Sequence, residues 1–130
     1  MAEAKRYEVT VVPKSSYVEE QSDPAKNQYV FAYTINITNT GNVPVQLLSR
    51  HWVITDANSK VLEVKGLGVV GQQPQLKPGE SFEYTSGTPL PTPSGIMVGI
   101  YQMETRGGDA FSVRIPAFSL DSPHQPVRLN

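Results

Sequence analysis

The chain has no cysteine, no long apolar run and no segment with the period of a helix. Without cysteine, disulfides, thiolate nucleophiles and zinc sites built on sulfur are excluded, which is compatible with a reducing compartment. No apolar run approaches the ~20 residues that a membrane span needs, and the N-terminal MAEAKRYEVTVVP lacks the apolar core of a signal peptide. We therefore expect a cytoplasmic protein with no membrane partner.

A surplus of charge of one sign is also lacking. Eleven Lys and Arg residues face 12 Asp and Glu residues, a net charge of −1, so no overall field would hold nucleic acid. With 130 residues, 38% of them hydrophobic, the chain is long enough to bury a stable core. We predict one domain over 1–120 and a flexible C-terminal tail over 121–130, where two prolines and few apolar residues leave little to bury.

What the chain does have is the two-residue period of β-strands. Residues 29–38 alternate between apolar and polar side chains, which predicts a strand with one buried face. In the next strand, 43–55, the apolar face changes near Ser49, which predicts a β-bulge. The run 96–103 is apolar on both faces, as in a central strand. Further strands are expected at 7–12, 61–65, 81–86 and 111–117.

Turn signals separate these strands. The sequence Asn39-Thr40-Gly41-Asn42 predicts a hairpin, and the longer connections 14–28 and 66–76 are expected to cross between two sheets. The pattern indicates an all-β, antiparallel β-sandwich, with a barrel as the alternative. Only Lys5, Arg6 and Glu8 discourage pairing at the first strand, so we predict a weak homodimer through its edge.

The glycines Gly66, Gly68 and Gly71 spell GxGxxG. In a dinucleotide fold this motif opens a helix whose amides hold pyrophosphate, but here Gln72-Gln73-Pro74 follows and no helix is expected. The favoured interpretation is that the glycines let the backbone bend sharply. The alternative is an anion site for pyrophosphate or a nucleotide, in which the backbone amides of Gly66, Gly68 and Gly71 are helped by Lys65.

The triplet Arg50-His51-Trp52 contains the only tryptophan of the chain. Strand alternation puts Arg50 and Trp52 on one face and His51 on the other, so the three side chains cannot converge. We expect Trp52 in the core; a partner-binding role for an exposed Arg50 is the alternative.

Metal and catalytic sites are not expected. The two histidines, His51 and His124, are far apart in sequence, and the numerous hydroxyl residues sit mostly in turns with no histidine near them in sequence. The turn near Asp56, Asn58 and Glu63 is interpreted as a solvated turn, with a weak Mg²⁺ site as the alternative. We therefore predict a non-enzymatic protein without a cofactor.

Three segments resemble the ApaG family, which is also called CorD. They are RHWVITDAN from Arg50, the long Pro- and Gly-rich block at 68–103, and IPAFSL at 115–120. The resemblance runs from Tyr7 to Leu120. It implies an immunoglobulin-like or fibronectin type III-like sandwich of bacterial cytoplasmic origin.

The resemblance also implies what such a domain does. The family is associated with cobalt and magnesium resistance or efflux, and with an operon that contains a diadenosine tetraphosphate hydrolase. Similar domains in eukaryotic F-box proteins and a DNA polymerase-interacting protein look like protein-interaction modules, which favours a binding module for an unidentified protein partner. Family members often have glutamate where this chain has Leu67 and Gln72, and glycine where it has Ser59. Losing both carboxylates disfavours a Co²⁺ or Mg²⁺ site in this loop.

Overall fold

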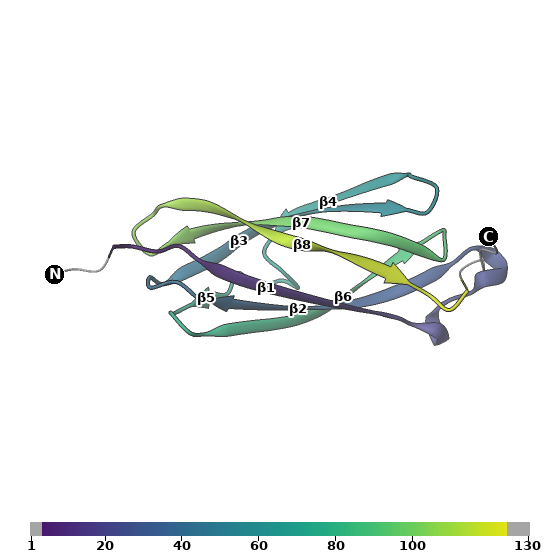
Figure 1. The fold of residues 1–130 in the computed structure, drawn as a ribbon, viewed down its shortest axis with the longest axis horizontal. Helices are drawn as coiled ribbons and strands as arrows, with labels where there is room; N and C mark the ends of the chain where they lie inside the picture. Colours follow the sequence, from purple (N-terminus) through teal and green to yellow (C-terminus); the bar gives the residue numbers. More distant parts are fainter. Residues whose placement is uncertain (1–3, 125–130) are drawn as a thin grey trace, which may run out of the picture.

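The protein is an all-β sandwich of two antiparallel sheets that pack face to face (Figure 1). The computed structural model describes residues 4–124. The predicted immunoglobulin/fibronectin type III-like sandwich is confirmed, and the alternative of a barrel is wrong because the two sheets stay separate. The strands are β1 (Val9–Tyr17), β2 (Tyr29–Asn39), β3 (Val45–Asp56), β4 (Val61–Leu67), β5 (Gln75–Leu76), β6 (Ser81–Leu90), β7 (Ser94–Thr105) and β8 (Ala110–Asp121).

One sheet has the strand order β1-β2-β6, and the other has the order β4-β3-β7-β8, with the short β5 also paired to β3. The prediction that 96–103 forms a central strand is confirmed, because β7 lies between β3 and β8. The edge strands β1 and β8 contact each other across the sandwich, where the Ser15 hydroxyl donates to the carbonyl of Ser119 at 2.6 Å. The opposite side, between β6 and β4, we call the open side.

Trp52 lies in the core, as the alternation of β3 predicts, and is 1% exposed. Its indole centroid is 5.4 Å from the ring of Tyr33 and 5.9 Å from that of Phe118. The indole fits because position 99 has no side chain: a Cβ at Gly99 would lie 2.7 Å from Trp52 Cε3 and 2.9 Å from Ile115 Cδ1. The two sheets are thus joined by aromatic packing over a glycine.

The predicted bulge in β3 is confirmed. The pairing of β3 with β7 shifts between Leu47 and Ser49, so Leu48 has no partner of its own on β7. The carbonyl of Leu48 instead accepts hydrogen bonds from the amide of Gly68 at 2.8 Å and from the side-chain amide of Gln73 at 2.9 Å. The bulge therefore anchors the glycine-rich segment to β3.

The expected hairpin at Asn39–Asn42 is wrong, because β2 and β3 belong to different sheets. Asn39 is 1% exposed, and its side-chain amide donates to the carbonyls of Val43 and Leu76. Its Oδ1 accepts the amide of Gly41 at 2.9 Å. The turn residues correctly predict a chain reversal, but a buried asparagine directs that reversal to the other sheet.

The two long connections do not cross between the sheets, contrary to the prediction. The strand β1 continues through Pro13 to Tyr17, and the proline is tolerated because β1 is an edge strand. Two 3₁₀ turns follow, at Glu19–Gln21 and Pro24–Lys26, and then β2 pairs with β1 in the same sheet. The segment after β4 returns to β3 as β5, so this connection stays in one sheet. The chain crosses between the sheets from β2 to β3, from β5 to β6 and from β6 to β7. No α-helix follows the glycines.

The strand β8 extends one residue past the predicted boundary at residue 120, and the flexible tail over 121–130 stays a prediction. The strand β8 includes Asp121, Ser122 is 6% exposed, and the ring of His124 is 5.6 Å from that of Tyr17. Residues 121–124 thus pack on the sandwich, and the rest of the predicted tail lies outside the described residues. Within residues 4–124 no helix is long and apolar enough to cross a membrane. The homodimer through β1 stays a prediction.

We expect Gly99→Ala to lower the free energy of unfolding by about 1–3 kcal/mol, because the new methyl group overpacks against Trp52. Gly107→Ala is the matched control: the nearest atom to its Cβ, Thr105 Oγ1, is 3.8 Å away. This control should change stability by less than about 0.5 kcal/mol. Urea denaturation monitored by the single tryptophan measures both, and equal stabilities would contradict the packing described.

Candidate functional site

The structure separates Lys65 from the glycines with which the sequence grouped it. Lys65 pairs with His51 across β3 and β4, and its exposed side chain lies on the outer face of the five-stranded sheet. Arg50 instead shares the inner side of β3 with Trp52 and approaches the backbone at Gly66 and Gly68. The cation beside the glycine segment is therefore an arginine from β3.

The three glycines serve different structural purposes. A Cβ at Gly66 would lie 2.8 Å from Nη1 of Arg50, so only glycine lets the guanidinium pack on the backbone there. Gly68 has φ +63°, and a Cβ would clash with the carbonyl oxygen of Gln72. Gly71 has φ +78° but open space around it. These positions agree with the favoured interpretation that the glycines allow a sharp bend.

Residues 69–72 form a tight turn, which we call the glycine turn. The amide and carbonyl of Val69 exchange hydrogen bonds of 2.8 and 2.9 Å with those of Gln72. The two central residues, Val70 and Gly71, have φ of 43° and 78°, as in a type I′ turn. A β-branched residue is strained in this region, at a cost of roughly 1–2 kcal/mol. Along the described chain, the amides of Val70 and Gly71 make no hydrogen bond.

Arg50 holds the segment before the turn in place. Its Nη1 donates to the carbonyl of Leu67 at 3.0 Å and to that of Gly68 at 2.9 Å. The donors on Nε and Nη2 have no hydrogen-bond partner within the described part of the protein. Arginine carries five N–H donors in a fixed fork, so one edge can anchor the chain while another stays available. The sequence argument placed Arg50 on the face of Trp52 but did not connect it with the glycines.

A cavity of about 310 Å³ lies on the open side, between the glycine turn and β6. We call it the Arg50 cavity. No aspartate or glutamate is among its lining residues, and Arg50 is the only charged one. The aromatic and polar part of the lining consists of Tyr33, Arg50, Trp52, Tyr84, Ser86 and Thr88.

Tyr84, which lines this cavity, is bonded to a second buried tyrosine, Tyr101. The hydroxyls of Tyr84 and Tyr101 are 2.5 Å apart and share a hydrogen bond. Burial raises the pKa of Tyr84 to about 12 and shifts the pKa of Tyr101 in the same direction. Both hydroxyls are therefore neutral donors at neutral pH. The indole Nε1 of Trp52 is buried and lacks a hydrogen-bond partner among the described residues.

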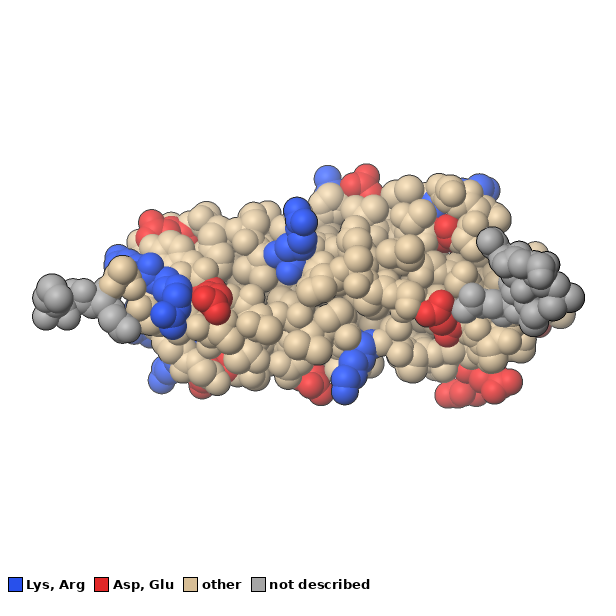
Figure 2. Space-filling view, viewed as in Figure 1, with Lys and Arg blue, Asp and Glu red and all other residues tan. Residues whose placement is uncertain are grey.

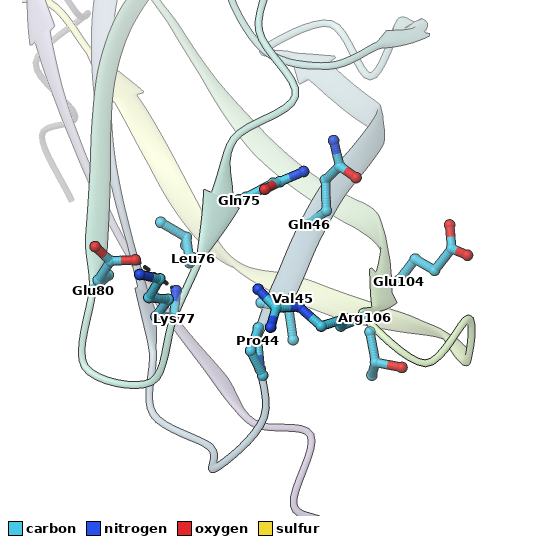
Figure 3. Close-up of a pocket in the computed structure, with 10 residues that line it drawn as sticks. Pro44, Val45, Gln46, Gln75, Leu76, Lys77, Glu80, Glu104 and Arg106 are labelled. Atoms are coloured by element: carbon cyan, nitrogen blue, oxygen red, sulfur yellow. Dashed lines mark hydrogen bonds between the residues drawn. The ribbon is translucent and has the colours of Figure 1, made fainter.

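A second hollow, of about 360 Å³, lies at one end of the sandwich (Figure 3). It is lined by both signs of charge. The carboxylate of Glu80 accepts the backbone amide of Lys77 at 2.7 Å, and Arg106 extends beside Val45. Because its acidic side chains would oppose an anion and its basic ones a cation, this hollow has less chemical definition than the Arg50 cavity.

The residues considered for a metal make contacts of their own. Oδ1 of Asp56 accepts the amides of Asn58 at 2.8 Å and Lys60 at 3.0 Å, which closes the turn after β3. Glu63 pairs with His51 at 2.8 Å on the outer face. Across residues 4–124, no three His, Cys, Asp or Glu side chains cluster as metal ligands would.

The fold and the site define an immunoglobulin-like β-sandwich domain with a ligand-sized cavity on its open side. The ApaG domain family matches residues 19–105. A Protein ApaG from Paramagnetospirillum magneticum is 63% identical over 123 residues, which covers 95% of this chain and 93% of that protein. A Protein ApaG from Bordetella pertussis is 59% identical over 119 residues, covering 92% and 91%.

Solved structures agree with these sequence matches. A Bordetella pertussis crystal structure has a TM-score of 0.90 and 57% sequence identity, covering 95% of this chain and all (100%) of that one. An X-ray structure of a structural genomics target has a TM-score of 0.84 and 44% identity, covering 94% and 95%. The chain belongs to the ApaG family, as the resemblance predicts.

We expect stability to fall as pH rises from 10 to 12, because the unfolded chain loses the Tyr84 proton near pH 10 while the folded chain retains it to about pH 12. Each such group costs up to roughly 1.4 kcal/mol per pH unit in that window. Tyr84→Phe should therefore show a shallower alkaline loss, although it loses a hydrogen bond to Tyr101 at pH 7.

Urea denaturation at pH 7, 10 and 11 measures this effect. The pH 7 comparison isolates the lost hydrogen bond, and lysine deprotonation affects both proteins alike. Identical pH slopes for the wild-type protein and Tyr84→Phe would contradict the raised pKa.

Proposed function

We propose that this protein is a non-enzymatic binding module that recognises a protein partner through the outer face of its five-stranded sheet. The observation that carries the proposal is an exposed apolar row on the central strand β7. Ile96, Val98 and Ile100 are 54%, 38% and 37% exposed. Apolar side chains grouped on a rigid, solvent-facing sheet are typical of interaction surfaces.

Neighbouring strands extend this row. Val98 pairs with Val53 on β3, and Ile96 pairs with Thr55, which in turn pairs with Val61 on β4. Val61 is 60% exposed. These residues share one face of the sheet because partners in register point the same way. We call the set the outer strip: Val53, Val61, Ile96, Val98 and Ile100.

Charged residues border the outer strip. The His51–Glu63 pair, Lys65 and Arg114 lie in the rows beside Val98 and Ile100. An apolar centre with a polar rim is the usual anatomy of a protein–protein interface. Elsewhere, positive and negative residues are interspersed over the face shown in Figure 2, without a continuous field of either sign. The partner is therefore expected to be selected by shape and apolar contact rather than by steering.

The arrangement of the histidines supports the non-enzymatic part of the proposal. His51 pairs with a carboxylate, but no hydroxyl in the described structure bonds to its ring. His124 packs against Tyr17 and Tyr29 at the end of the molecule. Nucleophilic catalysis needs a base bonded to its nucleophile, and neither histidine has such a bond among residues 4–124. The cobalt and magnesium resistance linked to the family would act through the partner.

We expect Val98→Glu to reduce recovery of a crosslinked partner from the source cell at least about tenfold, because it places a charge in the interface centre. Val12→Glu is the matched control, since Val12 is 49% exposed on the other sheet. It should leave recovery unchanged. Mass spectrometry of crosslinked pull-downs quantifies both. Failure of the wild-type protein to recover a reproducible partner, or equal losses in both variants, would refute the proposal.

A second candidate is the small-anion site of the glycine segment, for pyrophosphate or a nucleotide. The amides of Gly68, Val69 and Gln72 already donate to backbone carbonyls, so they do not favour a nest over the whole segment. The unpartnered amides of Val70 and Gly71 are what supports the candidate. Two adjacent amides at positive φ form a small concavity for an oxyanion.

For this candidate we expect millimolar pyrophosphate to shift the backbone NMR signals of Val70 and Gly71 in a saturable way. The amide of Gly107, in the β7–β8 turn, serves as the control for ionic strength and should not move with them. An unchanged spectrum at the glycine turn would end the pyrophosphate interpretation while leaving the outer-strip proposal untouched.

A further inference from the structure

The Arg50 cavity combines one cation, several neutral donors and aromatic walls. Its volume of about 310 Å³ lies at the small end of ligand pockets. Arg50 directs one edge of its guanidinium to the glycine segment and has Nε and Nη2 without partners in the described structure. A half-buried guanidinium with available donors favours an anionic ligand group, because carboxylates match its planar fork.

Trp52 supplies an independent observation that points to a ligand. Its Nε1 is buried and has no hydrogen-bond partner among the described residues, although Trp52 is 1% exposed. The Cε3 edge of the indole lies against Gly99 of β7. Trp52 is also among the residues that line the cavity. Buried indole N–H groups normally have an acceptor.

The remaining donors are neutral. When Tyr101 donates to the oxygen of Tyr84, the Tyr84 hydroxyl hydrogen is available to the cavity. Val70 and Gly71 also line the cavity, and their backbone amides lack partners in the described chain. The residues that carry these donors line one cavity, and no carboxylate is among its lining residues.

The charge count limits what can bind. One guanidinium compensates one negative charge, and a second charge drawn into a partly buried space would be left unpaired. The walls contributed by Tyr33, Ile54 and Val69 are aromatic or aliphatic. A polyphosphate carries more than one charge and has no apolar part, so it fits neither the single guanidinium nor the apolar walls. A monoanion on an apolar body fits both.

We propose that the Arg50 cavity binds a single carboxylate carried on an aromatic or branched apolar body, with Arg50 on the carboxylate and the indole of Trp52 in the wall of the site. A free organic acid and the C-terminal carboxylate of a peptide that ends in an aromatic residue share this chemistry. The site is separate from the outer strip, which lies on the opposite face of β3.

The test uses the full-length protein and phenylacetate at pH 7. Because the chain contains one tryptophan, the indole N–H gives a single, self-assigned NMR signal. Phenylacetate should shift this signal saturably with a Kd of about 1 mM, as expected for so small a ligand. The neutral isostere phenylacetamide should bind at least about tenfold more weakly, since it lacks the charge that pairs with Arg50.

Variants assign the interaction. Arg50→Gln should weaken phenylacetate binding at least about tenfold, whereas Arg106→Gln, at the end hollow, should leave it unchanged. Since Arg50 also anchors Leu67 and Gly68, Tyr84→Phe provides a second variant that keeps the ring and removes one donor. It should weaken binding about tenfold or more, the effect of one hydrogen bond to a charged group.

A peptide and pyrophosphate complete the test: the peptide distinguishes a free acid from a chain terminus, and pyrophosphate tests the competing anion site of the glycine segment. An acetylated tetrapeptide that ends in phenylalanine identifies a chain terminus as the ligand if it binds more tightly than phenylacetate, and a free acid if it does not bind. An unmoved indole signal at about 10 mM phenylacetate, equal binding of phenylacetamide, or tighter binding of pyrophosphate would overturn the proposal. None of these results bears on partner recovery through Val98.

Discussion

The packing of Trp52 over Gly99 is the constraint on which the rest of the structure depends. The indole fills the space that a side chain at position 99 would occupy, and it contacts Tyr33 from the facing sheet. This contact fixes which side of β3 faces the core. Since side chains alternate along a strand, the same choice turns Arg50 inward and places His51, Val53 and Thr55 on the outer face.

From that orientation the two candidate binding surfaces follow. The inner position of Arg50 brings a guanidinium beside the backbone of Gly66 and Gly68. The outer positions of β3 and β7 carry the apolar outer strip. One strand thus contributes an arginine to a cavity on one side and a valine to an exposed surface on the other, and both sit on rigid β-structure.

The departures of this chain from its family's usual residues have structural counterparts. Ser59 has φ 64°, a left-handed conformation in which a glycine would be unstrained. Leu67 is 79% exposed, so a glutamate would fit there without burial of its charge. Gln72 contributes to the turn with its backbone amide and carbonyl, which bond to Val69. These bonds do not depend on the side chain at position 72. The form of this turn is therefore independent of a carboxylate at either position.

Much of the fold follows from local patterns. The period of two along β2 and β3, the bulge near Ser49 and the burial of Trp52 are visible in the sequence because each depends on a few neighbouring residues. The segments at 50–58 and 68–103 are also read directly from the sequence, and the family resemblance that they carry implies the sandwich. The hairpin expected at Asn39 is wrong because the hydrogen bonds that turn the chain to the other sheet reach Leu76, which is 37 residues away.

The amino-acid sequence by itself determined that this is a cysteine-free, all-β domain of the ApaG family with its tryptophan in the core. Only the tertiary structure decided that the glycine segment stays beside β3, that Arg50 rather than Lys65 accompanies it, and that Tyr84 faces both across the open side. The physical reason is range: strand period and turn chemistry act between near neighbours, whereas a cavity is formed by strands whose proximity depends on the pairing of the entire sandwich.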